Sequence, residues 1–225
     1  MKSIKFLITT LLAVSFLILT SAKIADGGRE RKRIENAANV IEDFGKMRES
    51  IPHKLINDCQ GIIIIPKMIN AGFVVGAKRG RGIAMVKLEN GKWSNPVFIT
   101  LTGGSIGAQI GVQSVDVVLV FQHKGVLTKV QNGDFTIGGD ISAAAGPVGR
   151  SSTASTDYKM EAEVYSYSRS RGLFAGISIT GASLSIDKIA IANFYGKNYT
   201  SQQLFESSKT SSSAIKDVKE NLNKL

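Results

Sequence analysis

Cysteine, histidine and proline are scarce in this chain. Its 225 residues include one cysteine, two histidines and four prolines. A single cysteine cannot form an internal disulfide, so the fold depends on packing even in an oxidising compartment. We expect Cys59 to be a buried apolar residue and not a nucleophile. His53 and His123 do not supply the cluster of ligands that zinc or iron needs, so no metal or other cofactor is expected.

The apolar run near the start of the chain is short. It extends from Phe6 to Leu19, which is 14 residues, whereas a membrane-spanning helix needs about 20. Lys2 and Lys5 precede it, and Thr20-Ser21-Ala22 ends it. This layout is typical of a secretory signal peptide and favours that interpretation over a membrane anchor. We therefore expect cleavage after Ala22 and export to the periplasm or cell envelope.

Positive charge dominates the rest of the chain. The formal net charge is +10, and removing Lys2 and Lys5 with the signal leaves +8 on a mature part of 203 residues. We predict a signal at 1–22, a single domain at 23–208 and a polar basic tail at 209–225. A basic excess favours anionic partners. An exported protein meets membranes more often than nucleic acid, and the aromatic residues lie in apolar runs without the basic interleaving of a nucleic-acid stacking surface.

One amphipathic helix is predicted at 29–47. Ile34, Ala37, Ile41 and Phe44 recur every three or four positions, as on one face of a helix. Four cations open this segment: Arg29, Arg31, Lys32 and Arg33. Two interpretations stay open at this point. The helix lies in a membrane interface, or it packs on the domain with a solvated charged face.

Short β-type runs fill the middle of the sequence. Pro52 and Gly61 bound a short second helix, and Thr200 to Ser208 begins a short closing helix. Between them we predict strands at 62–65, 72–77, 83–88, 97–102, 115–121, 135–143, 161–167 and 173–186. The fold class is therefore α+β and mainly β, with a curved antiparallel sheet that forms a barrel or sandwich.

Glycine marks where this sheet should bend or turn. Asn90-Gly91 is a strong hairpin signal, and the glycines between Gly103 and Gly111 predict a strand that curves steeply. Lys78-Arg79-Gly80-Arg81-Gly82 lacks the spacing of a Walker loop or a dinucleotide fingerprint. We interpret this segment as a basic hairpin tip, whose three cations either hold a lipid phosphate or are simply solvated.

A nucleophile-elbow pattern offers an alternative function. Gly103 to Gly107 fits G-x-S-x-G, with Asp116 and His123 following Ser105 in the order of esterases. However, a β-type run follows Ser105 where the elbow requires a helix, so we favour a binding protein over an exported serine esterase or lipase. A structural or adhesion module of the cell envelope is a further alternative.

Several segments, taken in their order and spacing, resemble the SYLF domain family of lipid-binding, yeast-type actin-binding proteins. The matching segments are Ala71-Gly72-Phe73, Gly80-Arg81-Gly82, Gly91 to Pro96, Gly103 to Gly111 with Gln109, Asp116, Ala144 to Arg150, Tyr167 to Gly176 and Phe194-Tyr195-Gly196.

The resemblance implies a compact β-rich domain with no enzymatic activity, preceded by an amphipathic helix, that binds acidic phospholipids. Eukaryotic members also bind phosphoinositides and actin. In the family the basic helix carries much of the membrane contact, which favours the membrane interpretation of Arg29, Arg31, Lys32, Arg33, Ile34, Ile41 and Phe44. With the basic turn at Lys78, Arg79 and Arg81, these form the predicted lipid-binding set. Because the chain begins with an export signal, actin is not expected as its partner.

Overall fold

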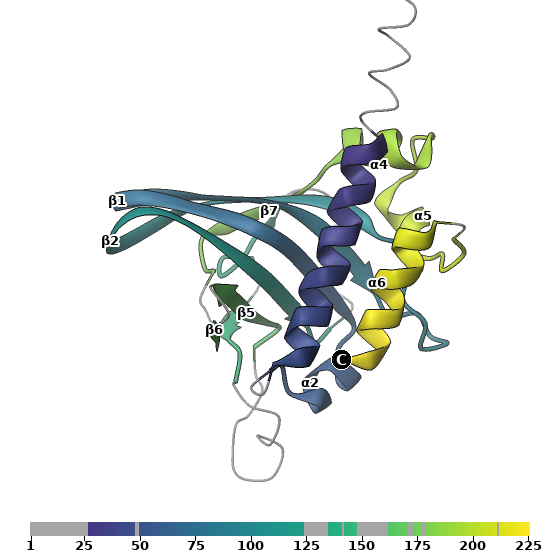
Figure 1. Ribbon diagram of the computed structural model, residues 1–225, viewed down its shortest axis with the longest axis horizontal. Coiled ribbons are helices and arrows are strands. Elements are labelled where there is room, and N and C mark those ends of the chain that lie inside the picture. The colour runs from purple at the N-terminus through teal and green to yellow at the C-terminus, as the bar shows by residue number, and fades with distance from the viewer. Residues whose placement is uncertain are drawn as a thin grey trace, which may run out of the picture.

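A strongly curved sheet with helices across one side makes up the fold (Figure 1). The computed structural model describes residues 27–47, 50–123, 135–140, 142–147, 162–170, 173–176, 179–210 and 212–225. The predicted signal at 1–22 lies outside these residues. The helices are the N-terminal helix (residues 27–46), α2 (His53–Asp58), α4 (Lys188–Tyr195), α5 (Ser201–Phe205) and α6 (Ser213–Lys224). The strands are β1 (Gly61–Val86), β2 (Val97–Phe121), β3 (Phe135–Thr136), β4 (Ala143–Ala145), β5 (Val164–Ser170), β6 (Leu173–Gly176) and β7 (Ala182–Ile186).

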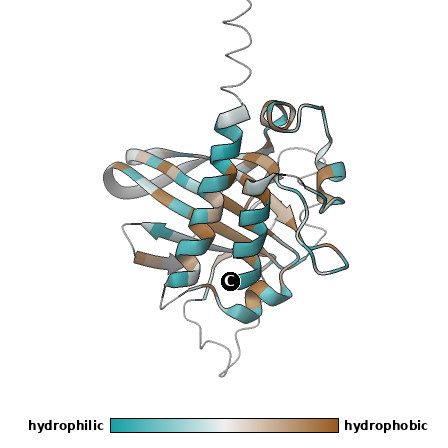
Figure 2. Ribbon diagram, turned by 45° about the vertical axis from the view of Figure 1, so that its right-hand side comes forward, coloured by the Kyte–Doolittle hydropathy of each residue, from teal (hydrophilic) through white to brown (hydrophobic). Residues whose placement is uncertain are grey.

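The predicted α+β fold class is confirmed, and its sheet is curled into a half-barrel. Neighbouring strands are antiparallel except β4 and β5, which run parallel. Hydrophobic strands lie behind helices whose outer turns are largely hydrophilic (Figure 2). Within the described part of the chain, no helix is long and apolar enough to cross a membrane.

Two long strands organise the sheet. β1 and β2 pair along almost their whole length, from Gly61 with Phe121 to Ala84 with Val97. The predicted turn at Asn90-Gly91 is confirmed between them, with Gly91 at a φ of 74°. This positive φ suits glycine because it has no Cβ. We call the β1–β2 pair the long ribbon.

The long ribbon is one strand pair where the sequence predicted several short strands. Pro66, which directly follows the predicted strand at 62–65, lies inside β1 at a register shift between Ile65 and Met68. The following residue, Lys67, has a φ of 49°. A bulge of this kind tolerates proline, because the local ladder is already interrupted there. Lys78 to Gly82 is likewise not a hairpin tip, since it lies within β1 and pairs with 99–103 of β2.

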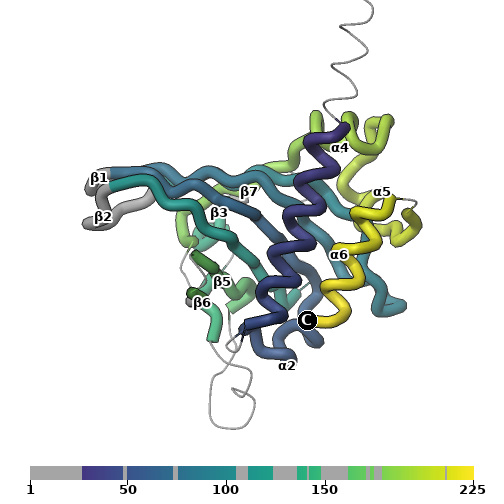
Figure 3. Tube along the Cα trace, in the orientation of Figure 1, coloured from purple at the N-terminus to yellow at the C-terminus, as the bar shows by residue number. Residues whose placement is uncertain are grey.

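The long ribbon folds back on itself, so that the two halves of β1 touch (Figure 3). A Cβ built on Gly82 would lie closer than 3.0 Å to the carbonyl oxygen of Ile64, and one on Gly80 would be equally close to the Ile65 side chain. Glycine at these two positions therefore permits the close approach. The second half of β2 also pairs with β5, and its first half pairs with β7.

The C-terminal segment corrects the prediction of a polar tail at 209–225. α6 buries Ala214, Ile215, Val218 and Leu222 in the core, and the Asn221 side-chain amide donates a 3.0 Å hydrogen bond to the Ala38 carbonyl of the N-terminal helix. The apolar stripe that drives this packing is sparse in a segment rich in serine and lysine. The serine and lysine side chains of α6 lie mainly on the opposite face, as in an amphipathic surface helix.

Cys59 is buried in the core, as predicted, and its thiol donates to the Ile56 carbonyl. Burial raises the pKa of the thiol from 9.0 to about 11. The unfolded chain therefore releases this proton at lower pH than the folded chain does. This group leaves stability unchanged below pH 9 and lowers it as the pH rises from 9 to 11.

We expect Cys59→Ala to flatten the alkaline decline in stability. The slope due to the thiol approaches about 1.4 kcal/mol per pH unit within this window. Urea unfolding of both proteins between pH 7.5 and 10.5 measures this slope. Tyrosine ionisation contributes equally to both proteins, so it cancels when their free energies of unfolding are subtracted. Parallel plots of unfolding free energy against pH for the two proteins would contradict the prediction.

Candidate anion-binding face

The apolar side chains of the predicted lipid-binding set lie in the core. Ile34, Ile41 and Phe44 on the N-terminal helix are fully buried, and the Phe44 ring packs edge-on against Phe174 of β6 at 5.6 Å between centroids. The stripe is real, but the sheet covers it. In this fold these three residues therefore do not face a membrane and are not part of the candidate site.

Arg33 is also largely buried. Its guanidinium lies 3.1 Å from the Asp187 carboxylate and 3.0 Å from that of Glu30. It also lies 5.2 Å from the centre of the Phe98 ring, with only 10% of its side chain exposed. Burial raises the pKa of Glu30, and the Arg33 charge opposes this. Arg33 thus ties the N-terminal helix to the sheet and to the start of α4, where Asp187 caps the helix.

Three cations of the N-terminal helix remain at the surface: Arg29, Arg31 and Lys32. Arg31 pairs with Glu35 at 2.9 Å and donates to the Ser213 hydroxyl of α6 at 2.8 Å. Lys32 is exposed. The charge of Arg29 lowers the pKa of the Glu30 carboxyl, which indicates that the two groups lie near each other.

Beyond the start of the N-terminal helix, the sheet presents an uncovered polar surface. Arg79 and Arg81 project from the same side of β1 because side chains alternate along a strand, and both are exposed. Their neighbours on β2 are Thr102 and Thr100. The next neighbours, on β7, are Ser183 and Ser185. We call these six residues the basic face.

The basic face adjoins the basic start of the helix. Arg81 lowers the pKa of Glu30, as Arg29 does, so both guanidinium groups lie near this one carboxylate. Lys78 lies on the opposite side of β1 from Arg79 and Arg81 by strand alternation. The structure thus places Arg29 and Arg81 of the predicted set near Glu30, with Arg79 beside Arg81 on β1. Arg33 pairs with the same carboxylate but is largely buried, and Lys78 lies on the other side of the strand.

Chemically, the basic face can bind an anion with several oxygens. Guanidinium groups donate in pairs to phosphate or carboxylate, and the hydroxyls of Thr100, Thr102 and Ser183 beside them can donate further hydrogen bonds. The Ser185 hydroxyl donates to the Thr100 carbonyl at 3.5 Å. These hydroxyl residues are not predicted as a site by the sequence pattern. The alternation Thr100-x-Thr102 and Ser183-x-Ser185 was visible, but only the strand register places it next to the arginines.

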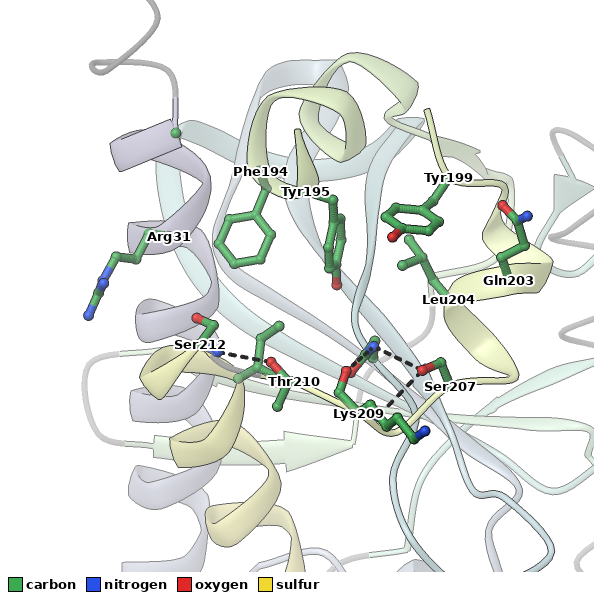
Figure 4. Close-up of a pocket in the computed structure, with 13 residues that line it drawn as sticks. Arg31, Phe194, Tyr195, Tyr199, Gln203, Leu204, Ser207, Lys209, Thr210 and Ser212 are labelled. Atoms are coloured by element: carbon green, nitrogen blue, oxygen red, sulfur yellow. Dashed lines mark hydrogen bonds between the residues drawn. The ribbon is translucent and has the colours of Figure 1, made fainter. Parts of the chain in front are cut away.

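A second concave site lies between α4, α5 and α6 (Figure 4). Its cavity of about 630 Å³ is lined by Phe194, Tyr195 and Tyr199 on one side and by the segment before α6 on the other. Asn95 holds this segment by donating a 2.8 Å hydrogen bond to the Lys209 carbonyl. Arg31 and Lys209 also line the cavity, but their charged ends point away from the aromatic rings. The cavity thus suits an uncharged group and not an anion.

The alternative esterase site is not assembled. Ser105 lies within β2 and pairs with Gly76, with strand on both sides, so the strand-turn-helix elbow is missing. The Asp116 carboxylate is occupied by Arg169 at 2.7 Å and by the Lys67 backbone N–H at 2.9 Å. Arg169 also pairs with Asp43 at 2.7 Å. Asp116 therefore anchors the end of the N-terminal helix to the sheet through Arg169.

Comparison with known proteins agrees with the resemblance seen in the sequence. SH3 domain-containing YSC84-like protein 1 of Xenopus laevis is 35% identical over 169 residues, which are 72% of this chain and 50% of that protein. Protein YSC84 of Saccharomyces cerevisiae is 32% identical over 183 residues, which are 77% of this chain and 39% of that protein. The chain therefore spans half or less of the length of these relatives.

A family model described as Ysc84, Las17-binding protein actin regulator, matches residues 102–225. This range includes Thr102, Ser183 and Ser185 of the basic face. It also includes α6, which lies in the predicted polar tail at 209–225. Because the match covers more than half of the sequence, the chain belongs to the Ysc84 family, also called the SYLF domain family.

Proposed function

We propose that this protein binds anionic phospholipid at a membrane surface through the basic face, the adjoining Arg29 and the exposed Lys32 of the N-terminal helix. The observation that carries the proposal is the exposed pair Arg79 and Arg81 beside four hydroxyl residues on an uncovered sheet surface. The family supports it, because Ysc84 proteins bind lipids and actin and are generally non-catalytic. An exported chain would meet the anionic lipid on the outer side of the membrane that it has crossed.

Electrostatics provides most of the attraction in this proposal. Each arginine or lysine near an anionic surface contributes about 1 kcal/mol, and the effect falls off within a Debye length of about 8 to 10 Å. The excess of +8 on the predicted mature part brings the protein to the surface, and the basic face orients it. Binding should therefore weaken as salt increases.

Co-sedimentation of residues 23–225 with vesicles tests this proposal. We expect binding to phosphatidylcholine vesicles that contain phosphatidylglycerol, and little binding to pure phosphatidylcholine. Arg79→Glu/Arg81→Glu should weaken binding about tenfold or more, because it removes two favourable charges and adds two unfavourable ones. Both side chains are exposed, so the fold should persist.

Lys92→Glu/Lys216→Glu is the matched control. It changes the net charge equally, at two exposed positions outside the basic face. An equal loss of binding in both variants would show that net charge alone attracts the protein. Equal binding to neutral and anionic vesicles would overturn the electrostatic proposal, and assembly without lipid binding would favour an envelope structural module.

A further inference from the structure

The bend at which the long ribbon folds back extends beyond the rest of the sheet (Figure 1). β5 pairs with β2 from Asp116 onward, and β7 pairs with it only up to Gly103. Between these limits, the described strands give β2 a single neighbour, β1. We call this stretch, residues 68–77 of β1 and 104–115 of β2, the ribbon tip.

Four residues of β2 in the ribbon tip are open to solvent, whereas Met68 at its base is buried in the core. Gly111, Val112, Gln113 and Ser114 are four consecutive exposed residues, and consecutive strand residues point to opposite sides. Val112 is 73% exposed and Ile69, on the other strand, is 42% exposed. Such large apolar side chains at the end of a projecting element are typical of an interaction site.

The ribbon tip contains no charged residue on either strand. Charges begin at its borders, with Lys67 and Lys78 on β1 and Asp116 on β2. Asp116 is neutralised by Arg169 at 2.7 Å. The border next to the tip is therefore basic, and it continues into Arg79 and Arg81 of the basic face. An uncharged end bordered by cations is the charge pattern that an anionic membrane interface would accommodate.

We propose that the ribbon tip inserts into the membrane interface while the basic face holds the headgroup phosphates. This inference rests on the proposed function and adds an apolar anchor to it. Insertion is shallow, because the tip is a two-stranded ribbon with backbone groups on its outer edges. Those groups need water or headgroup partners and would be unsatisfied in the hydrocarbon core. Val112 therefore reaches the boundary between headgroups and acyl chains.

Val112→Asp tests the anchor against a matched control. We expect this variant to bind anionic vesicles about tenfold more weakly than the parent protein, because a carboxylate replaces the inserted apolar group. Leu173→Asp introduces the same charge at a side chain that is 77% exposed on β6, outside the tip, and should bind as the parent does apart from the small effect of net charge. Equal losses in the two variants would overturn the proposal.

A fluorescent probe at position 112 locates the tip directly. The native Cys59 is buried with a raised thiol pKa, so an NBD label on Val112→Cys can be attached selectively. We expect a blue shift and quenching by shallow spin-labelled lipids on anionic vesicles, and neither change for a label on Lys92→Cys. Vesicle binding without these changes overturns the tip anchor but leaves the proposed function intact.

Two further outcomes are distinct from that one. Loss of all vesicle binding in the parent protein overturns the proposed function together with the anchor. Self-association in the absence of lipid that Val112→Asp abolishes would assign the tip to an interface between copies of the chain, and would also overturn the anchor.

Discussion

Replacing Gly82 with alanine is expected to lower the free energy of unfolding by about 3 kcal/mol or more. The new methyl group would approach the Ile64 carbonyl more closely than 3.0 Å. A backbone group cannot move aside as a flexible side chain can, so the two halves of β1 would separate. Overpacking typically costs 1 to 3 kcal/mol where side chains can adjust, and more where they cannot. Domains of this size are commonly stable by only about 5 to 15 kcal/mol.

Gly104→Ala provides the control within the same ribbon. A Cβ at Gly104 meets no atom within 4 Å, so its effect on stability should be small. Urea unfolding followed by the fluorescence of the single tryptophan, the buried Trp93, measures both variants. Equal stability of Gly82→Ala and Gly104→Ala would show that the ribbon halves do not approach as closely as the structure indicates.

Replacing Arg33 with methionine should cost about 3 to 5 kcal/mol of stability. The change keeps the length of the side chain but leaves the Glu30 and Asp187 carboxylates without their shared cation. Glu30 is buried, and its Oε2 atom accepts no hydrogen bond. Removing one partner of a buried ion pair is strongly destabilising because the remaining charge stays desolvated. We expect this loss to diminish at low pH, as protonation neutralises the carboxylates.

Arg31→Met is the corresponding surface variant. Arg31 and its partner Glu35 are 55% and 45% exposed, and such pairs contribute about 0 to 1 kcal/mol. Urea unfolding at neutral pH compares Arg33→Met with Arg31→Met. A similar small loss of unfolding free energy in both variants would contradict a structural role for Arg33. The result also bears on lipid binding, since charge reversal at Arg33 would weaken binding by unfolding the protein.

The elements of the fold could largely be predicted from periodicity, but their extent could not. The N-terminal helix, the β-rich middle and the turn at Asn90-Gly91 follow from local patterns. Pro66 looked like the end of a strand, because proline cannot donate to the ladder. Only the pairing with β2 shows that a bulge absorbs it. The stripe of α6 was visible in principle, but its four buried residues are diluted by serine and lysine.

The candidate site shows a sharper limit of sequence reasoning. Ile34, Ile41 and Phe44 form the same stripe whether a helix packs on a core or lies in a membrane, so the pattern alone cannot distinguish these cases. Arg79 and Arg81 were identified as candidate cations. Their neighbours Thr100 and Thr102 became visible only with the strand register, which depends on contacts between residues far apart in the sequence.

The long ribbon has a consequence for how the chain folds. Its two strands meet first at the turn around Gly91, and each further pair closes a longer loop, until Gly61 reaches Phe121 across 60 positions. Pairing can therefore proceed outward from one turn at a small entropic cost per step. The fold-back that brings Gly82 onto Ile64 involves both halves of β1, so we expect it to follow this pairing. We therefore expect the N-terminal helix and α6, which cover the completed sheet, to dock after it has formed.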